Sequence, residues 1–429
     1  MHTLRRSILA IALPAIASNI TTPLLGLVDS AITGHIGSAV YLGAIAVGGT
    51  VFNMLYWVLN FLRMGSGGLT AQAHGHRDHH TARLVLWRGM LLASLLGVLI
   101  IALSGVIGPL AVELVDTDGV TGALALRYFS IVVWGAPAVL CTYVLTGWFL
   151  GMQNTRVTMW MALFTNLLNI AVSVVLVFGL HWKIAGVATG TLVAQWAGLG
   201  FGLLVLRRYN ARPVGLRTLL RAGGLKRYFS INADIMLRTI CLVIVTTWFT
   251  RSGSRLGVDT LAANALLMQL FMLFSYFMDG FAYAGESLGG SLYAAGTRRS
   301  VERLSASLLR IGLTMASLFT IIYFIAGHLI LRLLTDQPDV VACAVTYLPW
   351  AAAVPLCGVW AFVWDGIFIG LTRTRAMLGS MLVAMTVFFG TWLFTLSMGN
   401  HGLWLAFCLY LLARGACEWA TFRYSPYFE

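Results

Sequence analysis

Long apolar segments recur along the whole chain, and their length constrains the fold more than any other feature. An α-helix needs about 20 apolar residues to cross the hydrocarbon core of a bilayer, and only helices and closed barrels can cross it. The chain is 59% hydrophobic and 10% charged, whereas soluble domains carry about 25% charged residues. The sequence therefore predicts an all-α integral membrane protein with twelve transmembrane helices. We expect them at residues 8–31, 42–66, 85–110, 121–150, 156–180, 184–206, 228–251, 260–286, 304–334, 340–370, 376–398 and 402–422.

The placement of the basic residues predicts how the chain is oriented. With the N-terminus in the cytoplasm, only Lys183, Arg251, Arg255 and Arg332 fall on the outer side, and the largest basic group lies at residues 207–227. Because Lys and Arg favour cytoplasmic loops, we predict a multi-pass protein of the cell inner (cytoplasmic) membrane with both termini in the cytoplasm. The net charge of +13 then indicates orientation and contact with anionic membrane lipids, and not binding of nucleic acid.

The two halves of the chain share a sequence pattern. Four positions marked by glycine or proline recur at a nearly constant offset of 218 to 221 residues, namely Gly37 and Gly257, Gly75 and Gly296, Pro137 and Pro355, and Gly151 and Gly370. A parallel duplication of six helices keeps both halves in the same direction, so an axis along the membrane normal should relate the lobes. We predict an N-lobe at residues 1–206, a cytoplasmic inter-lobe linker at 207–227 and a C-lobe at 228–429.

Asp29 is an acidic residue inside the first apolar segment, which also contains Pro14. A carboxylate in the membrane costs about 2.5–3.5 kcal/mol on insertion scales, so it needs a compensating role. Desolvation favours the protonated form, which would make Asp29 a proton carrier. Alternatively, Asp29 lies near the outer end of the helix and reaches water, although a bend at Pro14 would draw it inward.

Three polar residues of the fifth helix share one face. Asn166, Asn169 and Ser173 follow at spacings of three and four residues, which brings them together along a helix. With Thr191 on the next helix, they could form a polar cluster of the N-lobe around Asp29. They could also only join neighbouring helices, at about 0.6 kcal/mol for each hydrogen bond.

The second half has its own acidic residues, which are candidates for lining a C-lobe cavity. Asp279 and Glu286 lie seven residues apart, near one line along their predicted helix. We expect Glu286 near the cytoplasmic end, where its side chain can reach water, and Asp279 deeper. The alternative for Asp279 is an ion pair with Arg63 or Arg238. Asp365 precedes a predicted cytoplasmic turn and could line the cavity, cap the helix or gate it.

The sequence offers little for metal or catalytic chemistry. The residues His74, His76, Asp78, His79 and His80 resemble a metal cluster, but their spacing suits no regular site and they lie in a basic loop. There is no GxxxxGK[ST], HExxH or GxSxG motif, and the six cysteines form no CxxC pair. We therefore expect no metal, no cofactor and no enzyme.

Several stretches resemble the multidrug and toxic compound extrusion (MATE) transporters, over essentially the whole chain. Residues 28–37 carry the general resemblance. The DinF (DNA-damage-inducible) branch of this family is matched in particular at residues 61–64, 68–73, 279–284 and 365–370.

The resemblance implies a cation-coupled antiporter. It implies that the acid of helix one, here Asp29, takes up the coupling ion and that the helix-one proline, here Pro14, permits a bend. The family's N-lobe polar cluster falls on Asn169, Ser173 and Thr191, and Ser173 stands where the common pattern has an acid. Because Na⁺ prefers several oxygen ligands and a compensating charge, this departure favours H⁺ as the coupling ion.

We thus expect a secondary active antiporter that exports amphiphilic, cationic organic compounds in exchange for H⁺, with Asp29 as the protonation site. Its partners would be small-molecule substrates and membrane lipids, and we expect a monomer. One alternative is a Na⁺-coupled exporter of the same family. Another is a lipid-linked oligosaccharide or lipid flippase, which would need several basic residues in its cavity, whereas we place only Arg63 and Arg127 within or near the spans.

Overall fold

The computed structural model describes residues 2–34, 39–114, 119–220, 222–296 and 298–424. All regular elements within these residues are helical, and none is a strand. Twelve helical stretches in this part of the chain are long and apolar enough to cross a membrane. Each overlaps one of the segments expected from hydropathy, so the all-α membrane fold predicted from the sequence is confirmed.

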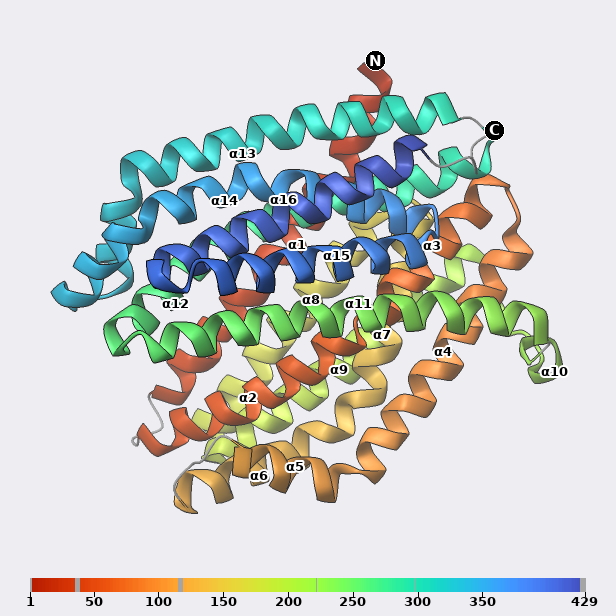
Figure 1. Ribbon diagram of the computed structural model, residues 1–429. Helices are drawn as coiled ribbons and strands as arrows, with labels where there is room; N and C mark the ends of the chain where they lie inside the picture. The colour runs from red at the N-terminus through yellow and green to blue at the C-terminus, as the bar shows by residue number, and fades with distance from the viewer. Residues whose placement is uncertain (1, 35–38, 115–118, 221, 297, 425–429) are drawn as a thin grey trace. The chain divides into compact units, whose positions relative to one another are not determined.

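Figure 1 shows the helices in chain order. In the first half they are α1 (His2–Gly34), α2 (Ala39–Leu59), α3 (Phe61–Gly75), α4 (His79–Ala102), α5 (Ser104–Leu114), α6 (Gly119–Val132), η1 (Val133–Gly135), α7 (Ala136–Gly151), α8 (Thr155–Val174), η2 (Val175–Gly179) and α9 (Lys183–Leu206). They continue with η3 (Arg207–Tyr209), α10 (Leu216–Leu219), α11 (Ala222–Arg255), α12 (Val258–Ala294), α13 (Arg298–Leu334), α14 (Pro338–Gly370), α15 (Thr374–Phe394), η4 (Leu396–Met398) and α16 (Asn400–Tyr424).

Some predicted segments differ from the helices in detail. The segment expected at 85–110 is divided, because α4 ends at Ala102 and α5 begins at Ser104. The Ser104 hydroxyl donates to the backbone carbonyl of Ile101 at 2.7 Å, and such a bond offers the backbone an alternative to helix continuation. The predicted linker is also partly helical, since it contains η3 and α10 and its last residues belong to α11.

The chain divides into two compact units, Ala17–Asn232 and Met1–Ile16 with Ala233–Glu429. The chain passes between them within α1 and again within α11. The first sixteen residues belong with the second half because α1 packs closely on α12. A Cβ on Gly280 would lie 2.9 Å from the carbonyl oxygen of Ala12 and 3.2 Å from Cδ1 of Ile16. The lobe boundaries expected from the sequence keep these residues in the first half and remain a prediction.

The same backbone contact occurs in each unit, at glycines 219 residues apart (151 and 370). In the first, a Cβ on Gly151 would lie 2.6 Å from the carbonyl oxygen of Gly67, so α7 lies directly on α3. In the second, a Cβ on Gly370 would overlap the carbonyl oxygen of Glu286, so α14 lies directly on α12. Gly67 and Glu286 are also 219 residues apart. Small residues permit such close helix packing in membranes, and the matched contacts support the predicted duplication.

Candidate functional site

Asp29 is half-buried near the end of α1. Its Oδ1 atom is buried and accepts no hydrogen bond from the residues that the structure describes. One helical turn on, the fully buried hydroxyl of Thr33 donates to the backbone carbonyl of Asp29 at 2.5 Å. The carboxylate is therefore left to bind a proton or another cation, because a buried oxygen without a donor is costly in its charged form.

The polar face of α8 meets α9 at a small hydrogen-bonded cluster. Asn169 Nδ2 donates to Thr191 Oγ1 at 3.2 Å, and Ser173 Oγ donates to Asn169 Oδ1 at the same distance. Thr191 also donates to the carbonyl of Val187 at 3.1 Å. The three residues expected from the sequence to lie together are therefore in contact. Asn169 and Ser173 are both buried, so this polar surface is directed into the protein and away from lipid.

Tyr128 of α6 connects this cluster to Asp29. Its hydroxyl hydrogen-bonds with Thr191 and interacts electrostatically with Asp29, and the side chain is only 7% exposed. Tyr128 thus belongs to the hydrogen-bonded cluster of α8 and α9 and lies within electrostatic range of the Asp29 carboxylate. The sequence gives no signal that distinguishes Tyr128 from the other thirteen tyrosines, since the contact depends on how α6 packs against α9.

The structure describes no hydrogen bond from the remaining N-terminal candidates to this site. Asn166 is half-buried one turn before Asn169. Pro14 is half-buried within α1, which is helical on both sides of it.

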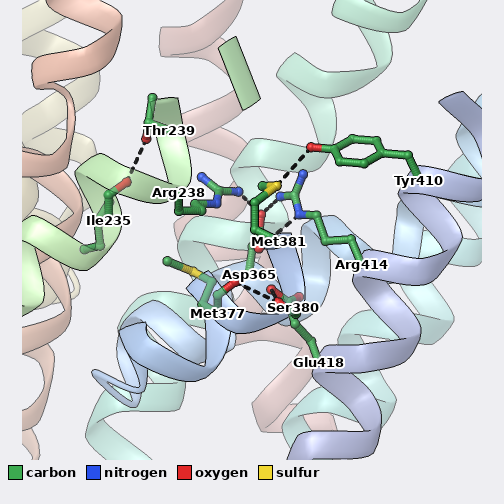
Figure 2. Close-up of polar contacts among 10 residues, drawn as sticks. All are labelled: Ile235, Arg238, Thr239, Asp365, Met377, Ser380, Met381, Tyr410, Arg414 and Glu418. Atoms are coloured by element: carbon green, nitrogen blue, oxygen red, sulfur yellow. Dashed lines mark hydrogen bonds and ion pairs between the residues drawn. The ribbon is translucent and has the colours of Figure 1, made fainter. Parts of the chain in front are cut away.

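In the unit that contains residues 233–429, Asp365 of α14 lies between two arginines (Figure 2). It forms ion pairs with Arg238 of α11 and Arg414 of α16, and Arg414 Nε also donates to Asp365 Oδ1 at 3.4 Å. All three residues are 6% exposed. Asp365 therefore links α11, α14 and α16 as a buried ion-paired centre, and its role in lining a cavity, capping or gating remains a prediction.

The sequence analysis did not predict Arg414 as part of a site and named Arg238 only as an alternative partner of Asp279, because the predicted orientation assigned both arginines to cytoplasmic segments. The statement that only Arg63 and Arg127 lie within or near the spans is therefore wrong. Both additional arginines are buried inside candidate membrane helices. An arginine is stable there only with a partner, and Asp365 is that partner.

Glu418 extends the same buried network. It lies one helical turn after Arg414 on α16, is 1% exposed, and accepts a hydrogen bond from Ser380 Oγ at 3.2 Å. The interaction of Glu418 with Arg414 and Arg238 is electrostatic. An Arg and a Glu four residues apart inside a predicted span would have been a usable sequence signal.

The acids of α12 occupy different environments from those expected. Glu286 is 1% exposed, so the prediction that it reaches water is wrong. The close approach of α14 at Gly370 covers this turn of α12. Asp279 is half-buried and interacts electrostatically with Arg414 and Tyr276. The ion pair of Asp279 with Arg63 or Arg238 remains a prediction.

The histidine-rich segment forms a helix cap. Asp78 accepts hydrogen bonds from the backbone N–H of Thr81 at 2.9 Å and from its hydroxyl at 2.6 Å, at the start of α4. These bonds lower the pKa of the Asp78 carboxyl. His76, His79 and His80 are exposed, and the part of the chain that the structure describes contains no group of three or more His, Cys, Asp or Glu able to hold a metal.

Known proteins resemble this chain along nearly all of its length. The family model described as MatE matches residues 14–175 and 235–390. DNA damage-inducible protein F of Escherichia coli (strain K12) is 40% identical over 417 residues, which cover 96% of this chain and 91% of that protein. Multidrug resistance protein MdtK of Edwardsiella ictaluri (strain 93-146) is 24% identical over 426 residues, 94% of this chain and 92% of that protein. A crystal structure of a MATE protein in a bent conformation has the same fold, with a TM-score of 0.90, 17% identity, and coverage of 98% of this chain and 95% of that chain.

Proposed function

Because the chain belongs to the MATE family of multidrug transporters, we propose that it exports amphiphilic, cationic organic compounds in exchange for H⁺. The printed name of one relative includes multidrug resistance, which supports the substrate class. The relatives are transporters and not enzymes. We propose the inner membrane as its location, with both termini in the cytoplasm, and a monomer as the working state, in contact with membrane lipids and small-molecule substrates.

The observation that carries the proposal is the environment of Asp29. One of its oxygens is buried without a hydrogen-bond donor among the described residues, and its charged form interacts with Tyr128. Protonation would remove the cost of a desolvated negative charge, and it would let the new O–H donate to a neighbouring acceptor. Binding and release of a proton would thus change the electrostatic interaction of Asp29 with Tyr128.

The same cluster supports H⁺ over Na⁺ as the coupling ion. It offers one carboxylate, three hydroxyls and one amide, from Asp29, Tyr128, Thr191, Ser173 and Asn169. The hydroxyls and the amide already bond to one another, and a single carboxylate gives a bound metal ion little compensating charge. A proton needs only the one basic oxygen that Asp29 provides.

The mechanism we propose is alternating access of the two lobes, 1–206 and 228–429. In transporters with parallel repeats the substrate path lies between the repeats, which rock about it. Protonation of Asp29 from the outer side would bias the lobes toward release of substrate to the outside, and the inward-facing state would return the proton to the cytoplasm. Pro14, which lacks a backbone N–H, would allow α1 to bend during this cycle.

The buried arginines of α11 and α16 do not support the flippase alternative. Arg238 and Arg414 are buried and paired with Asp365, so they are not available to a pyrophosphate group. Arg63 is buried on α3, whereas Arg127 is exposed on α6.

The test is transport in liposomes that contain the purified protein and a fluorescent cationic dye. A pH gradient and a Na⁺ gradient are imposed separately on the wild type, on Asp29→Asn and on Asp336→Asn, an exposed acid of α13's C-terminal loop. We expect dye efflux under the pH gradient alone, its loss to the protein-free level in Asp29→Asn, and its retention in Asp336→Asn. Efflux driven by Na⁺, or unchanged by Asp29→Asn, would overturn the proposal.

A further inference from the structure

A cavity with a basic wall lies in the Ala17–Asn232 unit, apart from Asp29. Its volume is about 520 Å³ and it is formed by the start of α2, one face of α6 and the turn that leads into α9. Arg127, His181 and Lys183 line it together with Tyr41 and Thr189. The basic side chains come from segments more than fifty residues apart, so the fold has gathered them at one place.

The charge of the cavity has one sign. Arg127, His181 and Lys183 are exposed, and none of the described residues that line the cavity is Asp or Glu. In the predicted topology this end of the unit faces away from the cytoplasm, where Lys and Arg are disfavoured. Arg127 and Lys183 therefore place two permanent positive charges at an outer cavity, although most Lys and Arg of this chain are predicted to lie in the cytoplasm.

The start of α9 adds to the positive potential. Ile184 and Ala185 are the second and third residues of this helix, and both line the cavity. The first N–H groups of a helix have no partner within the helix, and the helix dipole makes this end positive. Helix N-termini bind phosphate groups for these two reasons.

Two basic residues of the turn that leads into α9 have an unusual backbone conformation. His181 and Lys183 have positive φ angles of 57° and 51°, although neither is glycine. The N–H of the intervening Trp182 donates to the carbonyl of Leu176 at 3.0 Å, which ties the turn to the π-helical segment η2. Lys183 Nζ lies 5.9 Å from the ring centroid of Tyr41, so a cation–π contact positions its ammonium group at the cavity. Strained backbone of this kind persists where the surroundings impose it and often marks a binding site.

We propose that this cavity binds an anion that carries a phosphate group, either free phosphate or the headgroup of an anionic phospholipid. The Arg127 guanidinium can donate two parallel hydrogen bonds to phosphate oxygens, while Lys183 supplies a compact charge and α9 supplies backbone N–H groups. The ligand proposed for this cavity is an anion, whereas the ligand proposed for Asp29 is a proton. Binding of the anion therefore does not depend on the transport function proposed above.

The experiment is titration calorimetry on the full chain in an uncharged detergent. The two probes are inorganic phosphate and short-chain phosphatidylglycerol, and the variants are Arg127→Gln/Lys183→Gln and the control Arg255→Gln/Arg332→Gln. The control removes the same charge from exposed residues on the same predicted side. We expect wild type and control to bind at least one probe with similar Kd, and the Arg127/Lys183 variant to bind about tenfold or more weakly, since charge-assisted hydrogen bonds are lost.

The charge-conserving variant Arg127→Lys/Lys183→Arg separates loss of charge from loss of folding, and it should keep most of the affinity. Binding of both probes would identify free phosphate as a ligand, and binding of phosphatidylglycerol alone would identify the lipid headgroup. The proposal is overturned if neither probe binds the wild type, or if the Arg127→Gln/Lys183→Gln variant binds as tightly as the control.

Discussion

Asp365→Asn should destabilise the protein strongly, because it removes the negative partner of two buried arginines. The substitution conserves shape, so the change is almost entirely one of charge. In the wild type, Arg238 and Arg414 are balanced by Asp365 and Glu418 (Figure 2), and all four are 6% exposed or less. With asparagine at 365 the two guanidinium groups lose their shared ion-pair partner and face an amide that compensates neither charge.

The magnitude follows from burial. Breaking a buried ion pair by removing one partner costs about 3–5 kcal/mol, and here the same carboxylate serves two arginines. An exposed pair in the same unit gives the comparison. Arg298 Nε lies 3.1 Å from Glu302 Oε1 with side chains 26% and 40% exposed, so Glu302→Gln should cost about 1 kcal/mol or less.

The assay is the free energy of unfolding in mixed detergent micelles, measured for both variants under identical conditions. A double-mutant cycle with Arg238→Met adds a second test. Removing Arg238 should cost less in the Asp365→Asn background than in the wild type, because it then relieves repulsion instead of breaking an ion pair. The reasoning is refuted if Asp365→Asn costs no more than Glu302→Gln, or if the two substitutions of the cycle are additive.

Three further predictions concern the first unit. Tyr128→Phe deletes the hydroxyl that hydrogen-bonds with Thr191 and interacts electrostatically with Asp29. This variant should slow pH-driven dye efflux several-fold while the folded yield is unchanged. Efflux at the wild-type rate would contradict the prediction. Gly190→Ala places a methyl against the α8 backbone and should lower the free energy of unfolding by about 1–3 kcal/mol. Gly200→Ala is the control on the same helix. Its methyl meets open space, so the substitution should be neutral or stabilising by up to about 1 kcal/mol. Asp78→Ala removes the cap of α4 and should cost about 0.5–2 kcal/mol near neutral pH. Because hydrogen bonds from Thr81 lower the pKa of Asp78, the capping stability is present above about pH 3.9 and should disappear as the pH falls through the lower folded-state pKa.

Apolar length and residue spacing were sufficient to predict the membrane helices and the duplication. Both are properties of residues that are close along the chain or that recur along it, such as apolar length and the spacing of Gly151 and Gly370. The polar face of α8 was also predictable, because Asn169 and Ser173 are one helical turn apart and α9 follows directly. For these features the helical period and the apolar pattern are sufficient.

Which distant side chains meet depends on how the helices pack, and this could not be predicted from the sequence. Arg238 lies 127 residues before Asp365, and Arg414 lies 49 residues after it, so no local pattern joins them. In a membrane helix both the lipid-facing and the buried surface are apolar, and hydropathy therefore does not indicate which face packs inward. Arg238 and Arg414 lie inside the predicted spans 228–251 and 402–422, but hydropathy did not indicate that they pair with Asp365, and it did not distinguish Tyr128 from other tyrosines. Helix packing supplied both assignments, because a buried charge or hydroxyl is stable only where another helix brings its partner.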